Sequence, residues 1–160
     1  MKPLYPDEYW EVEVNWSKPS AYENIRDNGH ELDEYAYLYL ITARYSSNAP
    51  KSLYVGKTYQ QSVSKRLKQK DHRARYAAFT KHYSKHDFYI SFGEVSLSYG
   101  NITEKRIDDI ERILIYVNDP EHAQNVQNIC EHGVKGSYAI TNAGYRASFP
   151  KEVMLGVFTK

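Results

Sequence analysis

The chain has 160 residues, a mass of 18.7 kDa and a hydrophobic content of 41%, which is enough for one domain or for one domain with an appended arm. A mean hydropathy of −0.71 and the lack of a long apolar run argue against a membrane-spanning segment. The single Cys130 cannot form an internal disulfide, and the first residues lack a basic and apolar leader, so we expect a cytoplasmic protein.

The net charge is only +1, but the charges are distributed unevenly along the chain. Residues 1–34 are predominantly acidic, which disfavours contact with phosphate. Residues 51–86 contain one acid, Asp71, and a run of basic side chains. The basic residues are Lys51, Lys57, Lys65, Arg66, Lys68, Lys70, Arg73, Arg75, Lys81 and Lys85. Such a run is either a solvated helix face or a phosphate-binding surface.

The first predicted element is a strand in which Trp10, Val12, Val14 and Trp16 alternate with polar residues. A period of two is typical of an amphipathic strand. We expect the tryptophans to anchor an otherwise irregular acidic N-terminal arm on the core. Base stacking by these rings is the alternative, and the surrounding acids disfavour it.

Two runs rich in aromatic and β-branched residues, 35–43 and 52–58, flank a loop with Asn48 and Pro50 and predict a β-hairpin. A basic helix should follow, capped by Ser62 or Ser64. It is expected to continue to Phe79.

The side chain of Arg66 should point toward the sheet, because it shares one side of this helix with Val63 and Leu67. Residues 88–97 predict a third strand, with Gly93 as a bulge. Short apolar runs in the C-terminal tail could add a peripheral strand.

Residues 104–118 predict a helix with an apolar stripe that includes Ile107 and Leu114. Glu111 lies within this stripe, where an unpaired buried carboxylate costs several kcal/mol. A carboxylate at this position therefore needs a cation, a strong set of hydrogen bonds or a metal ion. Pro120 should end the helix.

The order of these residues resembles the GIY-YIG nuclease family over about residues 35–128. Tyr37-Leu38-Tyr39 stands where the family has Gly-Ile-Tyr, so that Tyr37 replaces its glycine, and Tyr54-Val55-Gly56 stands where the family has Tyr-Ile-Gly. The pattern continues with Arg66 on the next helix and Glu111 on a later one. Pro120 and then Asn125, with Asn128 as second choice, complete it.

The resemblance implies an α+β fold with a small, mostly antiparallel three-stranded sheet flanked by helices. The domain of residues 35–128 would follow the arm of residues 1–34. Residues 129–160 would form a C-terminal extension packed on the core.

The resemblance also implies metal-dependent hydrolysis of DNA phosphodiester bonds. The implied catalytic residues are Tyr39, Tyr54, Arg66, His72, Glu111 and Asn125. Glu111 would bind Mg²⁺ or another divalent cation such as Mn²⁺, and Arg66 would neutralise the phosphate oxygens. Tyr39 would help to activate the attacking water, which requires nearby positive charge from Lys57, His72 or the metal because a free phenol titrates near pH ~10.

The implied partner is double-stranded DNA, held by a group of basic side chains. These are Lys57, Lys65, Lys68, Lys70, Arg73 and Arg75. Two other functions stay open: a catalytically silent nucleic-acid-binding module, and a domain whose basic face binds an acidic protein partner. The sequence does not specify the cleavage site, the biological role or the oligomeric state.

Overall fold

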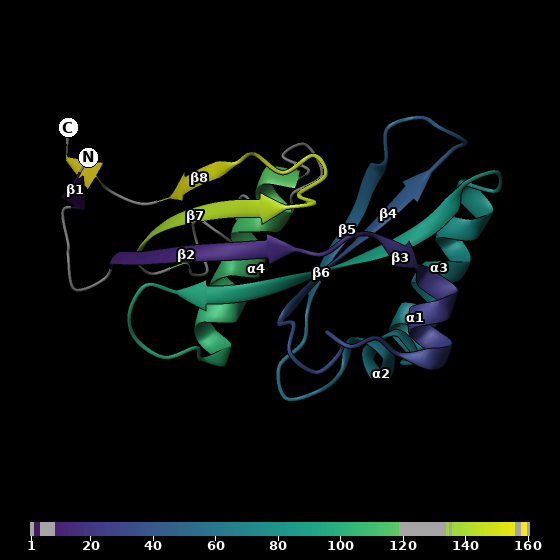
Figure 1. The fold of residues 1–160 in the computed structure, drawn as a ribbon, viewed down its shortest axis with the longest axis horizontal. Coiled ribbons are helices and arrows are strands. Elements are labelled where there is room, and N and C mark those ends of the chain that lie inside the picture. Colours follow the sequence, from purple (N-terminus) through teal and green to yellow (C-terminus); the bar gives the residue numbers. More distant parts are fainter. Residues whose placement is uncertain (1, 4–8, 119–133, 135, 156–157, 160) are drawn as a thin grey trace.

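The protein, described here by a computed structural model for residues 2–3, 9–118, 134, 136–155 and 158–159, has an α+β fold (Figure 1). Its main sheet has seven strands. These are β2 (Tyr9–Trp16), β3 (Ser20–Ala21), β4 (Leu38–Arg44), β5 (Lys51–Lys57), β6 (Asp87–Leu97), β7 (Ser137–Gly144) and β8 (Glu152–Leu155). The helices are α1 (Tyr22–Asn28), α2 (Val63–Leu67), α3 (Lys70–His82) and α4 (Glu104–Asn118). The short strands β1 (Lys2–Pro3) and β9 (Phe158–Thr159) pair with each other.

The expectation of a small, mostly antiparallel three-stranded sheet is wrong. Strands β5, β4 and β6 do lie side by side in this order and pair antiparallel. However, β6 continues into β2, β2 pairs in parallel with β7, and β7 pairs antiparallel with β8. The sheet is therefore larger and mixed, because segments on both sides of residues 35–128 in the sequence contribute strands to it.

The side chains of strand β2 are alternately buried and exposed, as the sequence predicts, so one face of the strand meets the core. Val12, Val14 and Trp16 are buried, whereas the intervening side chains are exposed. The buried face packs in one core cluster with α4 residues such as Ile110 and Leu114. The predicted bulge at Gly93 is absent, because Gly93 pairs in regular register with Trp16 of β2 and Leu38 of β4. Gly93 instead leaves room for the Trp16 ring, since a Cβ at this position would lie 2.9 Å from that ring.

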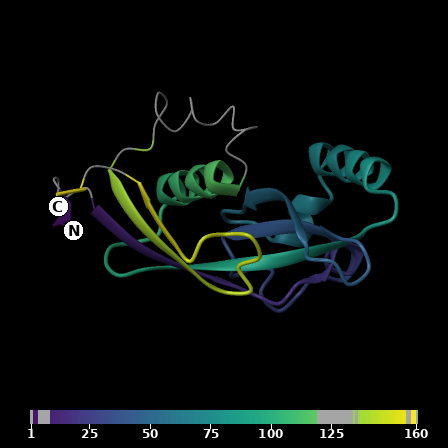
Figure 2. The same cartoon turned by 90° about the horizontal axis from the view of Figure 1, so that it is seen from above.

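The helices form two groups (Figures 1 and 2). Helix α4 lies along one side of the sheet, whereas α1, α2 and α3 gather at the end formed by β4, β5 and β6. Strand β4 is buried on both faces: Leu38 and Leu40 pack with α4, and Tyr39 and Ile41 pack with the other helices. This double burial makes β4 the strand at which the two groups of helices meet.

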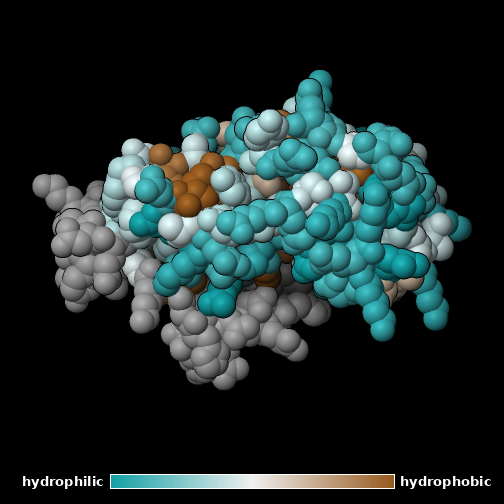
Figure 3. Space-filling model, turned by 90° about the horizontal axis from the view of Figure 1, so that it is seen from below, coloured by the Kyte–Doolittle hydropathy of each residue, from teal (hydrophilic) through white to brown (hydrophobic). Residues whose placement is uncertain are grey.

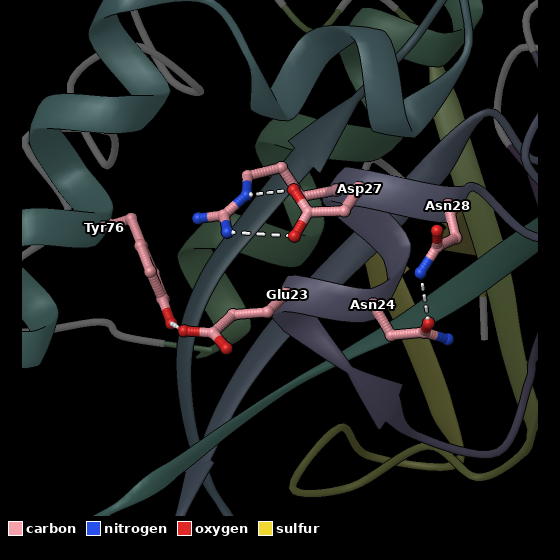
Figure 4. Close-up of polar contacts among 6 residues, drawn as sticks. Glu23, Asn24, Asp27, Asn28 and Tyr76 are labelled. Atoms are coloured by element: carbon pink, nitrogen blue, oxygen red, sulfur yellow. Dashed lines mark hydrogen bonds and ion pairs between the residues drawn. The ribbon is translucent and has the colours of Figure 1, made fainter.

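Helix α1 is not predicted by the sequence pattern, and its contacts explain its stability. Tyr22 and Ile25 are buried, and the Tyr22 ring stacks on Tyr76 of α3 at a centroid distance of 4.1 Å. The Tyr76 hydroxyl also donates a hydrogen bond of 3.1 Å to Glu23, as Figure 4 shows. A short helix of this kind depends on packing rather than on its own propensity.

The predicted basic helix is divided into α2 and α3. Ser62 caps α2 by accepting a hydrogen bond from the Lys65 backbone N–H, as one of the two alternatives predicted. Asp33 also accepts a bond from the Ser64 backbone N–H at 2.7 Å. The chain then turns at Lys68 and Gln69, which redirects the side chains of α3 relative to those of α2.

The surface seen in Figure 3 is mostly hydrophilic, with one small hydrophobic area. Among the residues that the structure describes, no helix combines the length and the apolar character needed to cross a membrane.

Gly56 and Tyr39 are direct partners in the pairing of β4 with β5. A Cβ at Gly56 would lie 2.2 Å from Cζ and 2.3 Å from Oη of Tyr39, so the ring of Tyr39 crosses directly over the glycine. Only a residue without a side chain leaves this space. The hydroxyl of the fully buried Tyr39 is thereby fixed beside the edge strand β5.

We predict that Gly56→Ala lowers the free energy of unfolding by about 1–3 kcal/mol, because the Tyr39 ring must move in a well-packed core. Urea unfolding measures this effect. In a Tyr39→Leu background the same substitution should cost much less, since the ring that it displaces is gone. Additive effects of the two substitutions would contradict this account.

Candidate active site

The sequence-predicted residues come together at the β5 edge of the sheet. Tyr39 lies on β4, Tyr54 and Lys57 lie on β5, and His72 lies on α3. Arg66 of α2 and Glu111 of α4 both influence the titration of the two tyrosines. Five separate elements thus contribute to one site.

A hydrogen bond of 2.9 Å joins the Tyr39 hydroxyl to Nε2 of His72. Both side chains are buried. Burial raises the pKa of Tyr39 far above its ordinary value, and the neighbouring Tyr54 adds to the rise. Burial also lowers the pKa of His72 to about 4, with contributions of the same sign from Arg75 and Arg66. Near neutral pH both groups are therefore uncharged, and His72 does not supply the positive charge that a Tyr39 base would need.

Arg75 contacts two members of the site. Its Nη1 lies 3.1 Å from Nδ1 of His72, and its guanidinium carbon lies 4.1 Å from the centroid of the Tyr54 ring. The sequence placed Arg75 among the DNA contacts. Its spacing of three from His72 puts both residues on one side of a helix, but the contact between them is seen only in the folded chain.

Tyr54 is the more accessible of the two phenols, being half-buried where Tyr39 is fully buried. Burial raises the pKa of Tyr54, and the charge of Glu111 adds to the rise. The charges of Arg75 and Arg66 act in the opposite direction.

Glu111 reaches the site because α4 is fixed against β5. Lys57 of β5 forms an ion pair with Asp108, and Glu111 follows Asp108 by one helical turn, on the same side of α4. Burial raises the pKa of Glu111 to about 7. The positive charges of Lys57, Arg112 and Arg66 oppose this rise.

Arg66 is half-buried, and its guanidinium group contacts two neighbouring side chains. It donates a hydrogen bond to Gln69 and forms an ion pair of 3.4 Å with Asp71. Its charge also lowers the pKa values of Tyr39, Tyr54 and Glu111 relative to what burial alone would give.

The six predicted DNA contacts fall into two groups. Lys65, Lys68, Lys70 and Arg73 are exposed on α2 and α3. Lys57 and Arg75 are partly buried and belong to the site itself. The exposed group therefore forms a positive surface beside the site, which we call the α2–α3 basic surface.

The donor set fits a divalent cation held by one protein carboxylate. Among the described residues, no hydrogen-bond or ion-pair partner is found for the Glu111 carboxylate, although the residue is half-buried. Within the same part of the chain, no three His, Cys, Asp or Glu side chains are grouped so that they could hold a metal. A cation at Glu111 would therefore take its other ligands from water and phosphate oxygens, as Mg²⁺ commonly does.

Two acids on α4 differ in a way that the sequence did not predict. Asp109 is the more deeply buried, and it accepts hydrogen bonds from Tyr138 at 2.8 Å and from Lys105 at 3.2 Å. Its charge is therefore used to join α4 to β7. Glu111 has no such partners in the described part of the chain, so its carboxylate, unlike that of Asp109, is not used to join α4 to the sheet.

Several predicted residues lie outside the described residues. They are Asn125 with its alternative Asn128, Pro120 and Cys130. A hollow of about 540 Å³, lined by β2, β6, β7 and β8 residues such as Glu13 and Met154, contains none of the predicted site residues.

Comparisons with known proteins add no relative whose residues could be matched to these. Neither the family models, nor the curated proteins, nor the solved structures contain a match to this chain.

Proposed function

We propose that the protein is a metal-dependent endonuclease that hydrolyses DNA phosphodiester bonds. The observation that carries the proposal is the Glu111 carboxylate, which is half-buried on the apolar side of α4 and has no hydrogen-bond partner among the described residues. Its charge influences the titration of Tyr39 and Tyr54, and the charge of Arg66 influences the titration of Glu111 itself. Burying such a carboxylate is costly unless a cation uses it. The GIY-YIG pattern contains the same residue types in the same order along the chain.

In this proposal Glu111 holds a Mg²⁺ ion, which stabilises negative charge on the phosphate when bound. Arg66 neutralises a nonbridging phosphate oxygen, to which its planar guanidinium can donate two hydrogen bonds. Tyr54, the accessible phenol, orients the phosphate or the attacking water. The α2–α3 basic surface holds the flanking DNA backbone.

A plasmid-nicking assay with and without Mg²⁺ tests the proposal. Conversion of supercoiled plasmid to the nicked form only with the metal supports it. DNA binding without nicking would favour the second candidate, a catalytically silent nucleic-acid-binding module. The burial of Tyr39 and the neutral state of His72 are the observations that favour this second candidate, because Tyr39 is shielded from solvent and a neutral His72 supplies no positive charge that would lower the pKa of Tyr39.

We predict that Glu111→Gln abolishes Mg²⁺-dependent nicking and leaves the protein at least as stable at pH 8 as the wild type. Folding raises the pKa of Glu111 from 4.5 to about 7, so stability falls as the pH rises from about 4.5 to about 7, and the full cost is present above pH 7. The uncharged amide avoids this cost, which amounts to about 1–3 kcal/mol. Urea unfolding of both proteins without metal, at pH 5 and pH 8, measures the difference. A marked loss of stability at pH 8 would instead make Glu111 a structural residue.

We predict that the Mg²⁺ concentration required for nicking rises as the pH falls below about 7, the pKa of Glu111. A protonated carboxyl group must lose its proton to bind the metal, so the apparent affinity should fall about tenfold per pH unit. Mg²⁺ titrations at pH 6, 7 and 8 test this. A half-saturating concentration that does not change with pH would rule out Glu111 as the metal ligand.

We predict that neutralising Lys65, Lys68 and Arg73 together flattens the salt dependence of duplex binding. The log–log slope should fall by about 0.9 for each phosphate group that the variant no longer neutralises. Fluorescence anisotropy with a short duplex measures the slope. Neutralising three exposed cations elsewhere, Lys18, Arg44 and Lys151, is the matched control and should leave it unchanged.

A further inference from the structure

Four aromatic rings lie in a row between the tip of the β4–β5 hairpin and the end of α3. The centroid of the Tyr45 ring lies 5.6 Å from that of His86, and the His86 centroid lies 5.1 Å from that of Tyr83. The Tyr83 centroid in turn lies 4.6 Å from that of His82. We call these four residues the aromatic row. None of them belongs to the candidate active site, and the proposed function does not use them.

Backbone hydrogen bonds fix the row on both sides. The Tyr83 N–H donates to the Phe79 carbonyl at 2.8 Å, and the His86 N–H donates to the Tyr83 carbonyl at 3.0 Å, which closes the turn after α3. In the hairpin loop, the Asn48 N–H donates to the Tyr45 carbonyl at 3.1 Å. The rings are therefore positioned before a ligand binds, and this lowers the entropic cost of binding.

The two ends of the row are open to solvent. Tyr45 keeps 46% of its surface exposed, and His82 is exposed as well, whereas Tyr83 and His86 are half-buried. Contacts that only fastened the hairpin to α3 would gain most by burying the outer rings, because the stabilisation by an aromatic side chain comes mainly from its buried area. An exposed ring is instead a surface on which an unpaired base can stack.

Positive charge surrounds the row. Lys51 Nζ lies 5.5 Å from the centroid of the Tyr83 ring, within the range of a cation–π contact. The segments 45–52 and 80–88, which carry the row, contain three exposed lysines and one acid. These are Lys51, Lys81, Lys85 and Asp87. Aromatic rings combined with cations are typical of surfaces that bind single-stranded nucleic acid, where the rings contact bases and the cations contact phosphates.

The exposed side of α3 connects the row with the α2–α3 basic surface. Lys70 and Lys81 are separated by about three helical turns, so they lie on the same side of the helix. Ala74 and Ala77 lie between them and are exposed, which leaves this side free of bulky side chains. The side spans about 17 Å, or about five nucleotides at the duplex spacing of ~3.4 Å. A DNA strand held at one end of α3 can therefore reach the row at the other end.

We propose that the aromatic row binds unpaired bases of a single DNA strand that runs along α3 from a duplex on the α2–α3 basic surface. This inference rests on the proposed function and names its substrate class, a duplex with a single-stranded extension. Tyr45 is the ring on which a base stacks, and Lys51 and Lys81 neutralise the flanking phosphates. Because every base has an aromatic face, the row holds the strand without reading its sequence.

Fluorescence anisotropy with the full chain and without Mg²⁺ tests the proposal, since binding is then measured apart from cleavage. The labelled probes are an oligothymidylate, a blunt duplex, and the same duplex with an oligothymidylate extension. The wild type should bind the extended duplex more tightly than the blunt one. Tyr45→Ala should weaken binding of the oligothymidylate and of the extended duplex by about 5–100-fold, as for the loss of one base–ring contact. Tyr45→Phe keeps the ring and should retain the wild-type affinity.

Tyr99→Ala is the matched control for Tyr45→Ala. Tyr99 has a similar exposure of 47% and also lies against another ring, that of Trp10. It follows the end of β6, whereas His86 precedes the start of this strand of 11 residues, so Tyr99 and the row lie at opposite ends of β6 (Figure 1). This variant should bind all three probes as the wild type does. Urea unfolding of both variants shows whether either substitution affects folding.

The outcomes separate this proposal from the proposed function. A wild type that does not bind the oligothymidylate, or an affinity that is unchanged in Tyr45→Ala or falls equally in Tyr45→Phe, would overturn the proposal, and the row would then only fasten the hairpin to α3. If the extended duplex binds through Tyr45 but is not nicked when Mg²⁺ is added, the proposed function fails and the binding site stands.

Discussion

The site depends on one steric constraint, the passage of the Tyr39 ring over the backbone of Gly56. This contact places a buried hydroxyl at the edge strand, where it is hydrogen-bonded to His72 and its ring lies beside that of Tyr54. The other residues could not compensate for a displaced ring, because the hydrogen bond between Tyr39 and His72 depends on its position. The glycine therefore contributes by leaving a volume empty, which explains why position 56, directly opposite Tyr39 in the pairing of β4 with β5, is a glycine.

The second constraint is electrostatic. The site contains several charged groups, but its flanking acids are paired: Asp108 with Lys57, and Asp71 with Arg66. Glu111 is left as the carboxylate without a hydrogen-bond or ion-pair partner in the described part of the chain. In the proposed function, this carboxylate would hold a single metal ion whose remaining ligands would come from substrate and water. This pairing pattern explains how neighbouring acids can differ in role on one helix.

The elements that the sequence predicts well are those defined by local periodicity. The helix expected at 104–118 is α4 with the same bounds, and the hairpin and third strand correspond to β4, β5 and β6 within a few residues. The parallel pairing of β2 with β7 was not predicted, because register between distant strands leaves no period in either segment. The short α1 was missed for the same reason, since its stability comes from Tyr76 on α3.

In the candidate site, too, the sequence predicts the features that are local and misses those that depend on distant contacts. The ordered Tyr, Gly, Arg and Glu positions could be found from the sequence, because each has a fixed place on its own strand or helix. The roles of Arg75 and Asp109 could not, because they depend on contacts with His72 and Tyr138 that only the folded chain creates. An acid on an apolar stripe, such as Glu111, correctly indicates a cost in folding stability. The sequence alone does not show which partner offsets that cost.

The central place of β2 has a consequence for how the chain folds. Trp16 donates a hydrogen bond of 3.0 Å to Asn142, a residue 126 positions later, and the whole of β2 lies between β6 and β7. Contacts over such separations close large loops and form slowly, whereas the hairpin of β4 and β5 is local. During synthesis, β2 can pair with β6 first, but its parallel pairing with β7 must wait until the C-terminal strands have left the ribosome. Until then the outer edge of β2 is unpaired and the core lacks Tyr138, Ile140 and Phe149, and this interval is when the nascent chain is most exposed to aggregation.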